Sequence, residues 1–81
     1  LYKLMDGRAE ALEFHIQKGS PVIGRPIKDL LLIDNLLICS IYRKGKPMIP
    51  NGQDHMEEDD LVVVVTTKKG LHDVKDILKR G

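Results

Sequence analysis

The residues that follow Ala9 alternate between apolar and polar side chains. Leu12, Phe14 and Ile16 are apolar, and polar residues stand between them. A period of two predicts a strand with one buried face. Gly19, Ser20 and Pro21 end this strand, because these residue types favour turns.

A helical pattern follows this break. Pro26 suits the first turn of a helix, and Ile27, Leu30 and Leu31 then recur at helical spacing. The spacing predicts a short helix that ends near Leu32.

Two apolar runs predict strands of a different kind. The run from Leu36 to Tyr42 has no breaker and predicts a strand covered on both faces, and Leu61–Val65 is the best candidate for a central strand. Between them, Pro47 and Pro50 bracket a short ribbon. Proline cannot donate to a ladder, so this ribbon is predicted at a sheet edge.

The chain closes on an amphipathic segment. Leu71, Val74, Ile77 and Leu78 define one face of a predicted helix, with Gly81 just past its end. The predicted order is β-α-β-β-β-α, an α+β domain with one sheet and two helices.

Composition narrows the class of protein. A chain of 81 residues is one small domain with a thin stability margin. Its net charge of +1 and its three aromatic residues argue against a nucleic-acid partner. No apolar run approaches the roughly 20 residues that span a bilayer, so no direct membrane insertion is expected. Because the chain starts at Leu1, we expect a fragment in which residues 1–8 lead in from a preceding domain and residues 9–81 form this one.

Few side chains are arranged for chemistry. Cys39 is expected as a buried core thiol in a reducing compartment. No metal site is expected at the acidic residues 54–60 or at the three histidines, which lack ligand spacing. No nucleophile has a base at usable spacing, so the chain is not expected to be an enzyme. Basic residues cluster at 43–46 and 68–69, where they promote solubility or contact an anionic ligand or partner.

The order of several short motifs resembles a known family. They run from Gly19 to Gly24, Ile27 to Leu30, Leu37 to Arg43, Ile49 to Gly52, and Asp60 before the valine-rich strand. Together they are similar to the C-terminal regulatory domain of TrkA-type potassium-uptake proteins, the RCK-C or TrkA-C domain. The resemblance covers about Ala9 to Val65.

The resemblance implies a cytoplasmic regulatory subunit that forms homodimers and controls potassium uptake through a membrane transporter, to which it is peripheral. It implies no resident cofactor but a small regulatory ligand, a nucleotide or cyclic dinucleotide, at the dimer cleft. The residues expected at this ligand-binding or dimer cleft are Leu30, Leu31, Ile33, Asn35, Leu36, Leu37, Ile38, Arg43 and Pro50.

The sequence departs from the family pattern in two places. Leu37 stands where binders of cyclic di-AMP carry Asn, and no Arg lies between Arg25 and Arg43. This argues against that ligand, since a polar base needs a polar partner in a dry cleft. Asp59 stands where the family commonly has Gly, and Asp tolerates the left-handed backbone that such a turn requires.

One argument for a partner is independent of the family. Leu30 to Ile33 with Leu36 and Leu37 form a nearly contiguous apolar stretch, part of which must be exposed in a monomer. A two-fold partner is the commonest way to cover such a surface. The alternative is the same ligand-sensing domain attached to another transporter, an antiporter or a transcription regulator.

Overall fold

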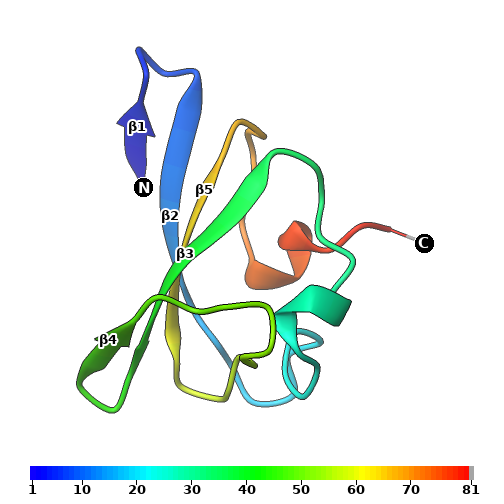
Figure 1. Ribbon diagram of the computed structural model, residues 1–81. Helices are drawn as coiled ribbons and strands as arrows, with labels where there is room; N and C mark the ends of the chain where they lie inside the picture. Colours follow the sequence, from blue (N-terminus) through cyan, green and yellow to red (C-terminus); the bar gives the residue numbers. More distant parts are fainter. Residues whose placement is uncertain (81) are drawn as a thin grey trace.

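All the strands in the computed structural model, which describes residues 1–80, lie in one antiparallel sheet (Figure 1). The order across this sheet is β1-β2-β5-β3-β4. The strands are β1 (Tyr2–Leu4), β2 (Ala9–His15), β3 (Leu36–Arg43), β4 (Lys46–Met48) and β5 (Leu61–Thr66). The valine-rich strand is central, as predicted, because β2 and β3 pair with its two edges.

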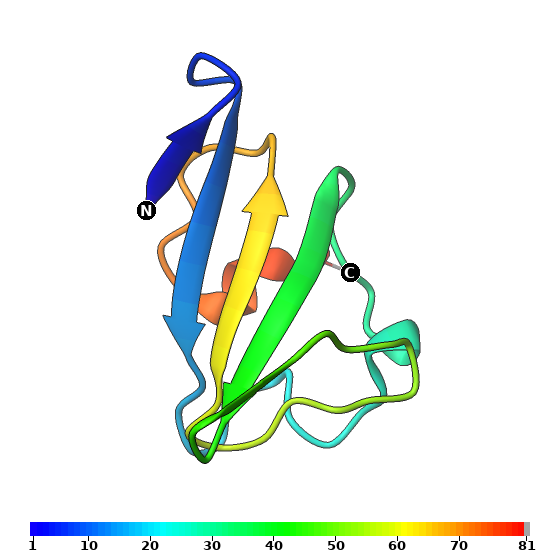
Figure 2. The same cartoon turned by 60° about the vertical axis from the view of Figure 1, so that its left-hand side comes forward.

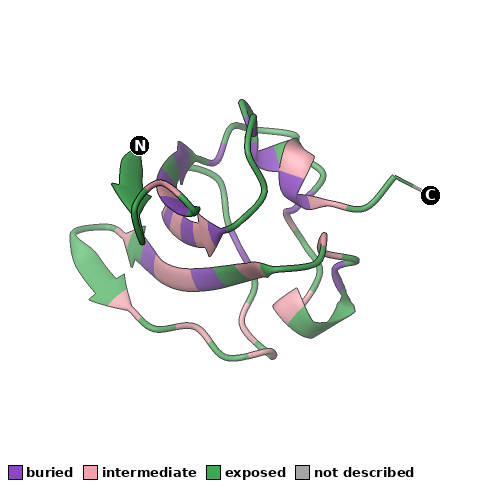
Figure 3. Ribbon diagram, turned by 90° about the horizontal axis from the view of Figure 1, so that it is seen from above, coloured by how far each residue is buried: buried purple, intermediate pink, exposed green. Residues whose placement is uncertain are grey.

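Only one face of the sheet is fully buried. On β5, Val62 and Val64 have no exposed surface, whereas the alternate residues Val63 and Val65 are half-buried. Figure 3 shows the same alternation along the strands. The prediction that β3 is covered on both faces is wrong, because Leu37 keeps 64% and Tyr42 keeps 47% of its surface exposed.

The core lies between the buried face of the sheet and the segments that cross it. Apolar residues of β2, β3 and β5 meet those of the turns and of the closing segment. The buried members are Leu12, Phe14, Ile16, Val22, Leu30, Ile38, Ile41, Met56, Val62, Val64, Leu71, Val74 and Ile77.

The first predicted helix is only a 3-10 turn, η1 (Ile27–Asp29). The backbone N–H groups of Ile27 and Lys28 donate to the carbonyls of Asp54 and Gly52, each at 2.8 Å. These donors are satisfied by a distant segment, and Leu30 already has an extended backbone. The turn therefore ends at Leu30, and the residues after it are held extended by long-range pairing, since Leu32 bridges to Leu78 and the Lys79 N–H donates to the Leu31 carbonyl.

The closing segment is likewise a single 3-10 turn, η2 (Val74–Ile77). Asp73 caps its start, and the chain is extended again at Leu78. The Ile33 N–H donates to the Ile77 carbonyl at 2.8 Å, and the Lys79 N–H donates to the Leu31 carbonyl at 2.7 Å. The chain leaves η2 paired with residues 31–33, so the helical spacing of its apolar residues extends over one turn only.

The predicted α+β class with two helices is therefore wrong. Residues 1–80 hold a five-stranded sheet and two 3-10 turns, and the fold is mostly β. The predicted apolar face of the closing segment is nevertheless the face that packs, because Leu71, Val74 and Ile77 are buried. The single sheet was predicted correctly.

The edges of the sheet are formed by short strands. β4 lies at one edge next to β3, with Pro47 inside it and Pro50 beyond its end, as the two prolines predicted. β1 forms the other edge and pairs with β2 through the turn at Asp6 and Gly7. Residues 2–4 thus belong to the same sheet, and a division of the chain after residue 8 stays a prediction.

Asp59 has a backbone angle φ of 71° in the turn before β5, the left-handed conformation expected for it. We predict that Asp59→Val lowers the free energy of unfolding by about 1–2 kcal/mol, because a β-branched side chain is strained there. Asp59→Gly should stay within about 0.5 kcal/mol of the parent, since it loses only an exposed contact with His15. Urea unfolding of both variants measures this, and equal losses would show that the backbone angle is not the cause.

Cys39 is half-buried rather than in the core. The pairing of β3 with β5 shifts register between Ile38 and Ser40. Cys39 lies at this bulge, where the ladder is interrupted. The expectation of a core thiol is wrong because the bulge displaces this position from the regular alternation.

Candidate functional site

The sheet face opposite the core, here called the outer face, carries an apolar surface. The strand register places Leu37, Val65, Ala11 and Tyr2 side by side across four strands. Because residues directly opposite in a ladder share a face, these side chains form one row. In Figure 2, η2 lies behind β2, β5 and β3, and the outer face of these strands is toward the viewer.

The outer face exposes large side chains. Tyr2 is 76% exposed and Leu37 is 64% exposed. At the start of β3, a depression of about 320 Å³ is lined by Asn35, Leu37 and Val65 among others. Isolated exposed apolar residues are ordinary, but a contiguous row next to a hollow is typical of an interaction surface.

The structure separates the predicted cleft residues. Leu30 and Ile38 are buried in the core, and Leu36 is half-buried on the same side. Asn35, Leu36 and Leu37 line the outer-face depression together. Within a single copy, the nine residues therefore do not line one cavity, and their role in a cleft stays a prediction.

Three further predicted residues lie elsewhere. Leu31 is 69% exposed, while its neighbour Leu32 bridges to Leu78. Ile33 is half-buried beside the closing segment, and Pro50 is half-buried after β4.

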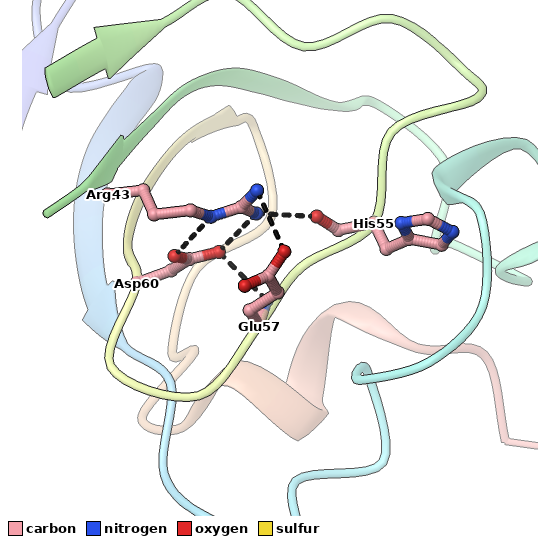
Figure 4. A network of polar contacts seen from close by, with 4 residues as sticks. All are labelled: Arg43, His55, Glu57 and Asp60. Carbon is pink, nitrogen blue, oxygen red and sulfur yellow. Dashed lines mark hydrogen bonds and ion pairs between the residues drawn. The ribbon is translucent and has the colours of Figure 1, made fainter.

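Arg43 is held in a polar network at the end of β3 (Figure 4). Its Nε and Nη2 donate to the two carboxylate oxygens of Asp60, at 2.9 and 2.8 Å. Its Nη2 also donates to the His55 carbonyl at 2.8 Å, and its Nη1 lies 3.0 Å from a carboxylate oxygen of Glu57. The guanidinium thus joins β3 to the turn before β5, and most of its donors are already used.

Asp60 is the buried partner of this network, with a side chain 1% exposed. It also accepts a hydrogen bond from the Glu57 N–H at 2.8 Å. Burial acts to raise the pKa of Asp60, but the hydrogen bonds from Arg43 and from the Glu57 N–H, with the charge of Arg43, hold it below its ordinary value. The same hydrogen bond raises the pKa of Arg43. The geometry indicates a structural clamp.

Part of the outer face was missed from sequence. Tyr2 and Leu4 belong to it through the pairing of β1 with β2, and Met5 lines the depression. The available signal was the Asp6–Gly7 turn, which is typical of a hairpin when a strand follows.

Residues 1–80 contain neither a metal-binding cluster nor a membrane-spanning helix. No group of three or more His, Cys, Asp or Glu side chains is placed to hold a metal ion there. Within the same range, no helix has the length and apolar character needed to cross a membrane.

Most of the chain is similar to proteins that are already known. Residues 11–79 match the family model described as the TrkA-C domain. The chain is 35% identical over 71 residues to a Trk system potassium uptake protein TrkA homolog of Archaeoglobus fulgidus, covering 88% of this chain and 16% of that protein. It is 33% identical over 73 residues to a homolog of the same name from Pyrococcus abyssi, covering 89% of this chain and 32% of that protein.

A relative of another kind also matches. The K(+)/H(+) antiporter NhaP2 of a Shewanella strain is 24% identical over 72 residues, covering 89% of this chain and 12% of the antiporter. The chain thus spans a third or less of each of these three relatives. With a match over residues 11–79, this chain belongs to the TrkA-C domain family.

Proposed function

We propose that this chain is a regulatory, dimerising domain of a cytoplasmic protein that controls potassium uptake through a membrane transporter. The names of the Trk relatives support the link to potassium uptake. The domain catalyses no reaction of its own. A small regulatory ligand changes its arrangement relative to a second copy. A nucleotide or a cyclic dinucleotide is the ligand class implied by the family resemblance.

The observation that carries this proposal is the apolar outer face. Contiguous exposed apolar surface is uncommon on a small monomer, yet Leu37 and Tyr2 are exposed at the two ends of the row on the outer face. A second copy placed on this face buries both sides of the sheet. An interface of this kind is isologous, so each row faces its own equivalent in the partner.

Regulation requires that the ligand binds two arrangements of the dimer with different affinity. The outer-face depression lies next to the proposed dimer contact, at Asn35 and Leu37. A ligand held there in contact with both copies changes their relation directly. A transporter attached to the rest of the protein then receives this change as a movement between domains.

The proposal is tested by the mass of the chain in solution. Leu37→Lys is expected to shift the dimer to monomer, with dissociation at least tenfold stronger, because it buries an unpaired charge at the contact. Sedimentation equilibrium over a concentration series measures the effect.

Leu31→Lys is the matched control, since Leu31 is the same residue type and is 69% exposed, against 64% for Leu37. It lies off the outer face and should leave the dimer intact. A monomeric parent protein would overturn the proposal. Dissociation by Leu31→Lys alone would move the contact to the segment before β3.

A second candidate is supported by the antiporter relative. The same domain would then control potassium and proton exchange. The two candidates share the dimer and the ligand but differ in the membrane protein attached. Potassium uptake by cells that carry the complete protein, measured with and without this domain, separates them.

A further inference from the structure

The fold brings two basic segments together around a groove that shares no lining residue with the outer-face depression. Lys68 and Lys69 follow β5, while Lys75, Lys79 and Arg80 belong to η2 and the residues after it. All five line a groove of about 720 Å³. A hollow of about 530 Å³ continues it and is also lined by Lys68, Lys79 and Arg80. Sequence grouped only the first two of these residues.

Charge is segregated into this groove. Five of the 13 Lys and Arg residues line it, together with only two of the 12 acidic residues, Asp34 and Asp76. The groove therefore has a formal charge of +3, although the whole chain has only +1 and the remaining residues have −2. A concave site lined by charges of one sign concentrates ions of the opposite charge.

The acidic residues leave most of this positive charge available. The Asp76 carboxylate accepts hydrogen bonds from the N–H groups of His72 and Asp73, at 2.9 and 3.0 Å, and so caps η2. Asp34 is 88% exposed and lies 3.7 Å from the Lys79 ammonium, a weak surface pair. Within residues 1–80, neither Lys68 nor Lys75 forms an ion pair.

The walls of the groove are partly apolar. Ile33, Leu71 and Leu78 lie among the basic side chains, and Leu71 is buried. The volume falls in the range of small-ligand sites, which combine an apolar surface with a few charged groups. Such a site suits a ligand with a compact, highly charged part and a less polar part.

We propose that this groove binds a phosphate-bearing anion. Lysines act on phosphate as point charges from several directions, and here they project from two segments that border one hollow. The phosphate belongs to a soluble compound or to a lipid headgroup, which present the same group to the lysines.

The test uses the whole chain at an ionic strength of about 0.05 M, where surface charge is weakly screened. Calorimetry with inorganic pyrophosphate and with ATP tests the soluble source. Co-sedimentation with vesicles of phosphatidylglycerol, compared with phosphatidylcholine, tests the headgroup. Binding in either arm supports the proposal and identifies the source, and binding in neither arm overturns it.

A charge-matched control separates the groove from general attraction. The pair Lys68→Gln and Lys75→Gln is expected to weaken binding about tenfold or more, because two direct phosphate contacts are lost. The pair Lys44→Gln and Lys46→Gln removes the same charge at the β3–β4 hairpin. This pair should change the affinity for the phosphate-bearing probe by less than about twofold. Equal weakening by both pairs would overturn the proposal, and thermal unfolding confirms that each variant is folded. Repeating the calorimetry with monomeric Leu37→Lys keeps the result independent of the proposed dimer.

Discussion

Asp60→Asn is expected to lower the free energy of unfolding by about 2–4 kcal/mol. Removing one partner of a buried ion pair typically costs about 3–5 kcal/mol, because the other charge is left unpaired. The lower end applies here since the Arg43 side chain is 26% exposed and can be partly hydrated. The change also removes an acceptor for the Glu57 N–H. Chemical denaturation at neutral pH measures the loss.

The effect should depend on pH in a defined direction. The pKa of Asp60 is lower in the folded state than its ordinary value of 3.8. Its charge therefore stabilises the fold fully above pH 3.8, and this contribution is lost as the pH falls below that value. The difference between parent and Asp60→Asn should shrink when unfolding is measured at about pH 3 instead of pH 7.

Asp34→Asn provides the control for this prediction. Asp34 is 88% exposed and its pair with Lys79 spans 3.7 Å, so the same chemical change should cost less than about 0.5 kcal/mol. If Asp60→Asn were as mild as Asp34→Asn, the clamp between β3 and the turn before β5 would not contribute to stability.

Ile77→Ala is expected to cost about 2–5 kcal/mol, the range for removing a buried branched side chain and leaving a cavity. Ile77 has no exposed surface, and its carbonyl accepts the Ile33 N–H. One 3-10 turn thus supplies a central core contact. Thermal and urea unfolding measure the cost.

Ile49→Ala is the matched control, because Ile49 is 82% exposed. This variant should unfold within about 0.5 kcal/mol of the parent. Equal costs for the two variants would show that η2 does not pack against the sheet as described.

Strands β2 to β5 could be predicted because their information is local. Alternation around Leu12 and Phe14 fixed both the strand and its buried side, and the run Leu61–Val65 identified the central position. The prolines around β4 similarly limited how far it could pair. Asp59 has the left-handed backbone conformation that its residue type permits.

The two helices could not be excluded in the same way. Ile27 and Leu30 have helical spacing, but the residues that follow them pair with the distant closing segment, where the Lys79 N–H donates to the Leu31 carbonyl. Spacing reports which residues face the core, whereas the partner of each N–H depends on a segment distant in sequence. At η2, the prediction of which residues face the core was therefore correct, and the prediction of an α-helix was wrong.

The sequence by itself determined strands β2 to β5, the core side of β2 and the membership of the family. Only the tertiary structure decided where the remaining polar and apolar groups meet. Arg43, a candidate for the cleft, is clamped to Asp60, while β1 adds Tyr2 to the outer face. The physical reason is that charge and exposed apolar surface act through distances in space, and those distances are set by chain crossings that no local pattern encodes.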